Sequence, residues 1–346
     1  MTAVAMEGAG TNRVEQRKRR LAVVLGVVWL FDAALQAQPF MFGHRFPRQV
    51  IDGAATGQPI IVAAPLHWFA NLLVSAPWID AFFVIIQLAI GLMLLARRWR
   101  RPALLASAGW AIGVWYFGDG LGGILGGHTT LLTGFPSAPL VYVAVSLALW
   151  PSPVDRSVAA VPVLGRSPRW RQVDAALGRR SGLVAIWSWV GLWTVAGLFR
   201  LLPGQHTAGA VGSTLSSMAA TAAPGVGSLD RLSAHLGGSL GLLVVALLAA
   251  GELAIGVGAL HRRWRPWAVG AGAALSLLFW VFGQNFGGIS TGTATDVAAA
   301  PIYILLAAVI ATTVPGALTR GKARARSVGS AMAGEPPAER FRRQAS

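Results

Sequence analysis

The stretch QLAIGLMLLARRWR at residues 87–100 returns, partly changed, as ELAIGVGALHRRWR at residues 252–265. Each stretch is an apolar run that ends in the basic turn Arg-Arg-Trp-Arg, and the two begin 165 residues apart. In the same frame, Trp, Phe, Gly and Ile positions of residues 115–127 recur in residues 280–292. Self-similarity at a fixed spacing is typical of an internal repeat. We therefore predict that the chain contains two copies of one structural unit.

The composition points to a lipid environment for both copies. Of 346 residues, 54% are hydrophobic and only 12% are charged, whereas soluble domains carry about 25% charged residues. The chain has no cysteine, which excludes disulfides, thiolate metal sites and iron–sulfur clusters. The net charge of +16 would favour nucleic acid in a soluble protein, but the basic residues cluster between apolar runs and form no basic face interleaved with aromatics. We predict that the partner is the lipid bilayer and that nucleic acid is not bound.

Eight apolar runs are long enough, or nearly long enough, to cross a bilayer, which takes about 20 residues. The first run follows the basic segment Arg17–Arg20 as a signal peptide would, but it continues to Phe42, so we predict a retained helix. Pro136 and Pro139 interrupt the fourth run, and the eighth is short. The runs lie at 21–42, 78–96, 102–118, 131–150, 183–202, 236–260, 266–284 and 298–315.

The distribution of basic residues gives the orientation. One side of the predicted spans carries 25 of the 29 Lys and Arg residues, which marks it as cytoplasmic. An even number of spans per copy gives both copies the same orientation. We predict an all-α integral membrane protein of the inner (plasma) membrane, with eight transmembrane helices as two parallel four-helix repeats and both termini cytoplasmic. The parts are a basic cytoplasmic N-terminus at 1–20, repeat 1 at 21–150, a basic cytoplasmic linker at 151–182, repeat 2 at 183–316 and a disordered basic cytoplasmic tail at 317–346.

The second and third helices of each copy resemble those of DoxX-like membrane proteins. The resemblance covers about 40 residues per copy and consists of a carboxylate or amide, an Ala-Ile-Gly step and a basic inner turn. DoxX-like proteins are small four-helix membrane subunits, some of them associated with quinone-linked oxidoreductases, so the resemblance implies a membrane redox partner. The chain departs from the pattern by its duplication and by an amide in the first copy. The matching positions are Glu252, Gly256 and Arg262, and more weakly Gln87, Gly91 and Arg97.

Three classes of function remain open at this point. The chain could be a DoxX-like subunit associated with quinone or redox chemistry. It could be a small-solute or proton-coupled transporter, or a non-catalytic membrane scaffold. No sequence signature identifies a catalytic residue, a cofactor, a substrate or an oligomeric state.

Ionisable side chains inside the apolar runs are costly in lipid and commonly functional. Asp32 lies about eleven residues into the first run and Glu252 about eight residues from the inner end of the sixth, which places both roughly 12–16 Å deep. They either belong to a proton or substrate path or join the helices, as acids hydrogen-bonded to neighbours or, for Glu252, as an ion pair with Arg200. The candidates for a buried polar path are Asp32, Gln36, Gln87, Arg200 and Glu252.

The glycine-rich outer loops are the second candidate site. Residues 118–123 formally satisfy GxGxxG, but a nucleotide fingerprint requires a preceding strand, and this stretch follows a predicted membrane helix. The glycines either permit close backbone packing or let the loops line a cavity at membrane depth. The polar lining of such a cavity would be Asp119, His128, Gln284, Asn285 and Asp296.

Histidines form the third candidate site, since five of the six fall in predicted outer loops. His67 and His235 each precede the second helix of their copy and could ligate haem iron or a metal ion. No HxxH or HExxH spacing accompanies them, and ordinary interfacial hydrogen bonding is the alternative. His67 also lies in the stretch Ile60–Pro77, for which we predict an interfacial or a re-entrant helix.

Overall fold

The computed structural model describes residues 2–126, 129–152, 161, 164, 167–202, 205, 207, 209–222, 225, 227–228, 231–232, 234–235 and 241–314, with side chains at all of these except 2–12 and 221. His128, His206 and the predicted tail at 317–346 lie outside these residues, as does part of the predicted linker. Throughout the described residues the secondary structure is helical, and no strand occurs there.

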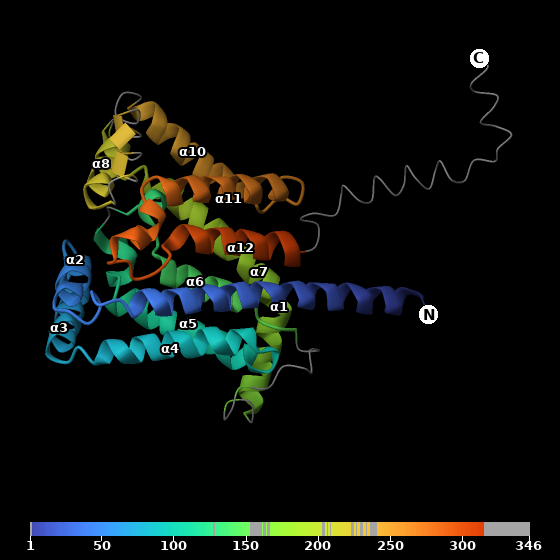
Figure 1. The fold of residues 1–346 in the computed structure, drawn as a ribbon. Coiled ribbons are helices and arrows are strands. Elements are labelled where there is room, and N and C mark those ends of the chain that lie inside the picture. Colours follow the sequence, from blue (N-terminus) through green and yellow to red (C-terminus); the bar gives the residue numbers. More distant parts are fainter. Residues whose placement is uncertain are drawn as a thin grey trace, which may run out of the picture.

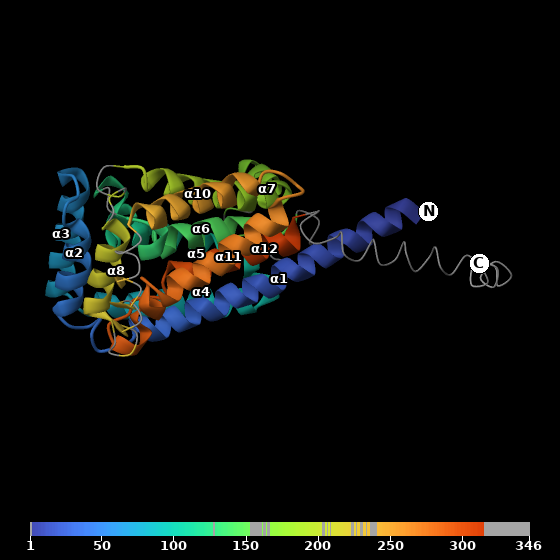
Figure 2. The ribbon, with the colours of Figure 1, turned by 90° about the horizontal axis from the view of Figure 1, so that it is seen from above.

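Eight helices in the described part of the chain pack into one bundle (Figures 1 and 2), and each overlaps one of the eight apolar runs. By length and composition, the segments Pro168–Phe199 and Arg265–Thr291 are apolar enough to cross a membrane, and a bent pair of helices, Ile60–Ser75 with Ile79–Leu95, passes as a third crossing. The bundle helices are α1 (Thr2–Gln36), α4 (Ile79–Leu95), α5 (Arg100–Phe117), α6 (Ala138–Ala148), α7 (Pro168–Phe199), α10 (Leu242–Gly258), α11 (Arg265–Val281) and α12 (Ala299–Thr313).

Three helix boundaries differ from the predicted runs. Helix α1 begins at Thr2 and ends at Gln36, so it includes most of the segment predicted as a separate N-terminus. Helix α7 begins at Pro168, inside the predicted linker, because the Ser167 hydroxyl accepts from the backbone N–H of Trp170 at 3.5 Å and proline suits the first helical turn. Helix α6 begins only at Ala138, after Ser137 with φ of 83°. The fourth run is therefore half loop and half helix.

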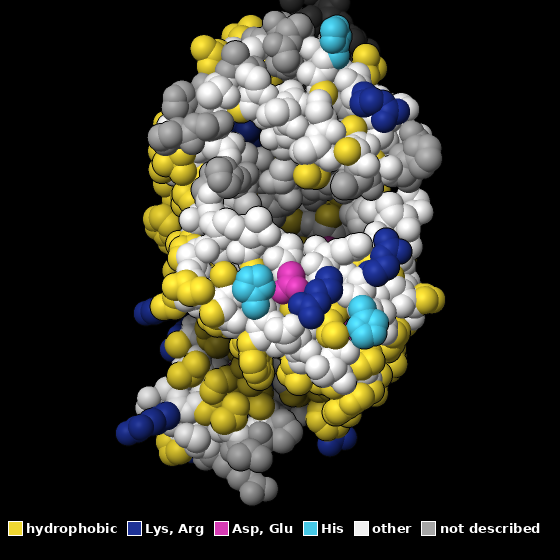
Figure 3. Space-filling model, turned by 90° about the vertical axis from the view of Figure 1, so that its left-hand side faces the viewer, with side chains coloured by type: hydrophobic (Ala, Val, Ile, Leu, Met, Phe, Trp, Pro, Cys, Tyr) yellow, Lys and Arg dark blue, Asp and Glu magenta, His cyan; other side chains and the backbone are white. Residues whose placement is uncertain are grey.

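Short helices lie across one end of the bundle (Figure 1, left). They are a π-helical turn (Pro47–Ile51), α2 (Asp52–Ala55), α3 (Ile60–Ser75) and α8 (Ala210–Thr221). The helix predicted for Ile60–Pro77 is confirmed as α3, which meets α4 at 103°. Figure 3 looks onto this end and shows a hollow near the middle of the face. The start of α1 and the end of α12 lie at the opposite end of the bundle.

The two halves of the bundle pair their helices in the same way. Helix α1 packs on α4 and α5 on α6, just as α7 packs on α10 and α11 on α12. Between the halves, α6 contacts α12, while α1 contacts α12 and α7 contacts α6. The fourth helix of each half therefore lies at the interface and touches the first helix of the other half.

The glycine-rich loops of the two halves share one backbone conformation. Four consecutive residues in each loop have positive φ. The values are 53°, 59°, 63° and 69° for residues 120–123, and 50°, 54°, 72° and 64° for residues 285–288. Each loop is also held by an equivalent indole. Trp115 Nε1 donates to the Pro136 carbonyl at 2.9 Å, and Trp280 Nε1 donates to the Val297 carbonyl at 3.0 Å.

Gly122→Ala is expected to destabilise the protein by about 2–4 kcal/mol. A Cβ at this position would lie 2.1 Å from the Pro136 carbonyl oxygen, and φ of 63° strains any side chain. Gly109→Ala in α5 is the matched control, because a Cβ there meets nothing within 4 Å. The thermal midpoint in detergent measures both variants. Equal midpoints would contradict the close packing of this loop.

Candidate functional site

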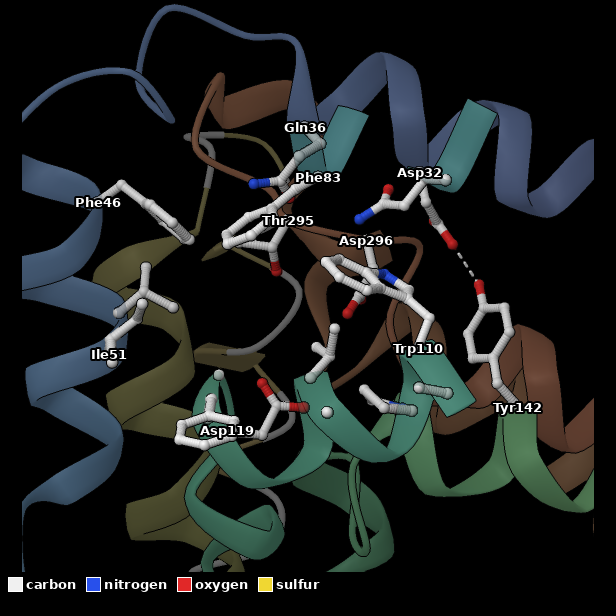
Figure 4. Close-up of a pocket in the computed structure, with 18 of the residues that line it drawn as sticks. Asp32, Gln36, Phe46, Ile51, Phe83, Trp110, Asp119, Tyr142, Thr295 and Asp296 are labelled. Atoms are coloured by element: carbon white, nitrogen blue, oxygen red, sulfur yellow. Dashed lines mark hydrogen bonds between the residues drawn. The ribbon is translucent and has the colours of Figure 1, made fainter. Parts of the chain in front are cut away.

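A cavity of about 280 Å³ lies inside the first half of the bundle (Figure 4). Its walls come from α1, α3, α4, α5 and α6, together with the loop that precedes α12 in the second half. Most of the lining is aromatic or aliphatic. The polar lining consists of Asp32, Gln36, Gln87, Asp119, Tyr142, Thr295 and Asp296.

Asp32 lies on the inner wall, with 2% of its surface exposed. The Tyr142 hydroxyl donates a hydrogen bond to Asp32 Oδ2 (dashed in Figure 4). The backbone N–H of Val297 donates to Asp32 Oδ1 at 3.2 Å. Because Val297 belongs to the loop before α12, the two halves of the chain meet at this carboxyl group.

Asp119 and Asp296 line the same cavity from two loops. Asp119 follows α5 and accepts a hydrogen bond from the Ser137 hydroxyl, while Asp296 Oδ1 accepts from the backbone N–H of Ala298 at 2.7 Å. Burial and the nearby carboxyl of Asp296 raise the pKa of Asp119 to about 7, although the Ser137 hydrogen bond opposes this shift. Burial likewise raises the pKa of Asp296. The two loop carboxyls therefore share one electrostatic environment.

The raised pKa of Asp119 predicts a loss of stability as pH rises. Between the unfolded pKa of 3.8 and the folded value of about 7, the folded protein holds a proton that the unfolded chain has lost. The stabilisation is complete below pH 3.8 and disappears as pH passes 7. One pKa unit corresponds to about 1.4 kcal/mol, and solvent contact of this half-buried carboxyl reduces the total to about 1–2 kcal/mol.

Thermal unfolding in detergent at pH 5 and pH 8 measures this effect. We expect Asp119→Asn to lower the pH dependence seen in the parent protein and to gain relative stability at pH 8. Asp52→Asn is the control, because this carboxyl is ionised in both the folded and the unfolded protein from pH 5 to pH 8, so its replacement should leave the pH dependence unchanged. Although burial opposes it, hydrogen bonds from His67 and Arg48 lower the pKa of Asp52. A pH dependence unchanged by Asp119→Asn would show that this carboxyl is not the titrating group.

Two amides complete the polar lining. Gln36 and Gln87 are 5% and 6% exposed. Gln87 Oε1 is buried and accepts no hydrogen bond within the described part of the chain, and Gln36 points toward the cavity in Figure 4. Among the described lining residues there is no Lys, Arg or His. The cavity therefore offers carboxylate and amide acceptors without a basic side chain beside them.

An open vestibule of about 660 Å³ adjoins the cavity on the side that Figure 3 shows hollowed. Both glycine-rich loops line it, and it shares Asp119, Thr295 and Asp296 with the cavity. Gln284 and Asn285 also line the vestibule. Four of the predicted outer-cavity residues are thus brought together, and two of them reach the deeper cavity as well.

The amides on the second half's side of the vestibule support its backbone. Gln284 Nε2 donates to the Leu131 carbonyl at 3.0 Å, and its Oε1 accepts from the Ala300 N–H at 3.0 Å. Asn285 Nδ2 donates to the Met218 carbonyl at 3.0 Å. Gln284 therefore joins the loop before α6 to the start of α12, across the two halves.

Arg200 and Glu252 form a buried ion pair away from the cavity. Arg200 Nε and Nη2 donate to the two carboxylate oxygens of Glu252, each at 2.8 Å, and the side chains are 2% and 0% exposed. Arg200 caps the end of α7, and its length brings the guanidinium to Glu252 in α10. Of the interpretations considered for Glu252, this geometry supports the structural ion pair.

The ion pair occupies positions that correspond to the two cavity amides. Aligning Trp29 with Trp193 places Gln36 opposite Arg200, and the repeat spacing places Gln87 opposite Glu252. Two neutral amides that line the cavity in the first half thus correspond to two charged residues in the second. The change from amides to charged residues can be read in the sequence, and it distinguishes the cavity of the first half from the ion pair of the second.

The two histidines predicted as ligands lie on the surface. His67 Nδ1 is 2.8 Å from Asp52 Oδ1, and Arg48 Nη1 contacts Asp52 Oδ2 at 2.9 Å. His235 is exposed. In the described residues, no group of three His, Cys, Asp or Glu side chains is arranged to hold a metal ion. For His67, the contact with Asp52 favours the alternative of ordinary hydrogen bonding at the surface.

Sequence reasoning missed Tyr142, Trp110 and Thr295 as members of the site. Tyr142 and Tyr303 occupy similar places in the two halves of the sequence, but only the fold shows the Tyr142 hydroxyl on Asp32. A tyrosine inside an otherwise aliphatic helix was the available signal, since a buried hydroxyl requires a partner. No family model, curated protein or solved structure matches the chain.

Proposed function

We propose that this chain is a polytopic inner-membrane protein that crosses the bilayer eight times as two parallel DoxX-like repeats with both termini cytoplasmic. The overlap of eight helices with eight apolar runs supports the spans. The matching loop conformations and helix pairings support the duplication. Helices α6 and α12 are shorter than a span, but buried loop backbone at membrane depth is compatible with lipid when it lines a cavity.

In this orientation the vestibule faces the outside of the cell. The basic turns, including Arg97–Trp99, belong to the cytoplasmic side by the charge rule. The loops that bear Asp119 and Asp296 belong to the other side. Helix α3 would lie in the outer interface, where its exposed Ile60, Ile61 and Trp68 contact lipid.

The function that this geometry supports best is proton-coupled transport of a small solute. The observation that carries it is the continuity of the outer vestibule with the buried cavity through Asp119, Thr295 and Asp296. A solute from outside can thus reach carboxyl groups that take up and release protons. Carboxylates inside membrane bundles commonly mark such proton and substrate paths.

Quinone binding, the activity that the DoxX-like resemblance implies, is the second candidate. Its support is the aromatic lining of the cavity beside the Tyr142 hydroxyl, since ring stacking and a hydrogen-bond donor suit a quinone headgroup. In this case the chain would be a subunit of a membrane redox complex. Quinone extracted in stoichiometric amount from the purified protein would favour this candidate over transport.

Single cysteines test the proposed access, because the natural chain has none. We expect a membrane-impermeant maleimide to label Thr295→Cys and the exposed vestibule residue Thr293→Cys in intact cells. Trp264→Cys, in the basic turn and 58% exposed, should react only after permeabilisation. Labelling of Trp264→Cys in intact cells would overturn the topology. Labelling of Thr293→Cys without Thr295→Cys would overturn access to the cavity.

A further inference from the structure

Three acids from distant segments face the cavity without a basic partner. Asp32 comes from α1, Asp119 from the loop after α5 and Asp296 from the loop before α12. The cavity's remaining titratable group is Tyr142, which donates to Asp32. Buried carboxylates require compensation, either by protonation or by a positive charge. Within the described lining, no side chain supplies that charge, so a ligand can.

An unsatisfied acceptor independently indicates where a donor would bind. Gln87 is 94% buried and its Oε1 has no hydrogen-bond partner among the described residues. A buried polar atom without a partner is uncommon and calls for an explanation such as a ligand. An N–H group in the cavity would satisfy it. A positively charged N–H group would therefore suit both the three carboxylates and this amide oxygen.

An aromatic wall forms the other side of the cavity. Phe69 contacts Phe117 and Phe83 at ring-centroid distances of 5.4 and 6.1 Å, and Phe83 contacts Trp110 at 5.3 Å. Aromatic faces attract cations and also bury apolar groups. At about 280 Å³, the cavity is near the lower end of small-molecule sites, which span about 300–1,000 Å³.

A bare metal ion fits this arrangement less well than a larger cation. Calcium and magnesium require several oxygen ligands at about 2.0–2.6 Å. The described residues include no cluster of three acids or histidines suited to that geometry. A cation with its own apolar body would bridge acids that stand farther apart and would fill the aromatic side.

We propose that the cavity binds a small organic cation, an ammonium group on an apolar body, in exchange for a proton. The ammonium lies among Asp32, Asp119 and Asp296, and its apolar part lies against Phe83 and Trp110. Binding adds one positive charge to the cavity and releases one proton to the solvent, so the charge balances. This inference deepens the proposed function, because it names the class of solute that such a transporter would carry.

Calorimetry on the purified full-length protein with four matched probes tests the inference. They are phenethylammonium, benzyltrimethylammonium, neutral 2-phenylethanol and anionic phenylacetate. We expect both cations to bind at least tenfold more tightly than the neutral and anionic probes. Cation binding should release a proton and weaken as pH falls, since protons compete for the same carboxyls. Equal binding of phenylacetate or 2-phenylethanol would overturn the proposal.

Two variants connect the binding to this cavity. Asp32→Asn should weaken both cations at least tenfold, and Gln87→Leu should weaken phenethylammonium more than benzyltrimethylammonium, which has no N–H to donate. Gln87→Leu should still fold, because the substitution removes a buried oxygen that has no hydrogen-bond partner among the described residues. Asp80→Asn is the matched control, because Asp80 is a buried acid (1% exposed) that does not line the cavity. Equal affinities in all three variants would place the binding elsewhere and refute the proposal.

The outcomes separate this inference from the proposed function. If no cation binds while Thr295→Cys is labelled from outside, the solute class is wrong and outward access stands. If the cations bind as expected while Thr295→Cys stays unlabelled and Thr293→Cys reacts, the solute class is supported and the proposed access fails.

Discussion

Arg200→Met is expected to destabilise the folded protein by about 3–5 kcal/mol, because it leaves the carboxylate of Glu252 buried without its partner. The pair is bidentate at 2.8 Å, and Glu252 is 0% exposed. Glu252→Gln should also destabilise, since it leaves the guanidinium uncompensated. We expect a lower thermal midpoint in detergent and less protein in the membrane for each variant.

The double variant Arg200→Met with Glu252→Leu separates the pair's structural role from a role in transport. Apolar replacement of a whole buried pair is commonly neutral or stabilising, so the double variant should recover the midpoint and retain binding of the cationic probes. Arg48→Met is the control, since its ion pair with Asp52 is on the surface and contributes about 0–1 kcal/mol. A double variant that folds but binds no cation would contradict the structural assignment.

Asp32→Asn is expected to weaken cation binding at least tenfold, or by about 1.4 kcal/mol or more, and to lower cation uptake with it. Asparagine keeps the size of the side chain and an acceptor for the Val297 N–H. It removes the negative charge and the proton-exchanging group together. Uptake of radiolabelled benzyltrimethylammonium into proteoliposomes with an acidic lumen measures the effect.

Asp80→Asn provides the control for this measurement, as a buried acid of the same half outside the cavity. Proteoliposomes that hold Asp80→Asn should take up the cation as fast as those that hold the parent protein. Tyr142→Phe should give an intermediate loss, because it removes one hydrogen bond from Asp32 but leaves the charge. Parent-level uptake by folded Asp32→Asn would exclude this carboxyl from the transport path.

The helices and their order could be predicted from the sequence, because hydrophobic length is a local property of the chain. The repeated loops could also be located, since their glycines recur in frame. The helix ends were less predictable. The end of α1 at Gln36 and the late start of α6 at Ala138 depend on how the loops pack against the rest of the bundle.

The candidate site could be predicted only as separate pieces. Asp32 was assigned to a buried path, and Asp119 and Asp296 to an outer cavity, whereas the fold puts all three in one cavity. The reason is a contact between residues 265 apart, in which the loop before α12 reaches Asp32 through Val297. No local pattern contains that contact.

Arg200 and Glu252 illustrate the limit of depth estimates. Arg200 lies near the outer end of its apolar run and Glu252 well inside its own, but the end of α7 packs beside residues 249–253 of α10, where Gly197 faces Leu253, so the two side chains meet. An alignment of the two halves places them at the positions of Gln36 and Gln87, two residues that line one cavity.

Exchange of an organic cation for protons in an outward-open acidic cavity is tested most directly by the luminal pH of proteoliposomes that hold the protein with its vestibule outward. A trapped pH-sensitive dye follows this pH after external benzyltrimethylammonium is added. We predict that the lumen becomes more alkaline as the cation enters and that Asp32→Asn abolishes the change. Cation uptake without any change in luminal pH, or an equal change in protein-free vesicles, would contradict the account.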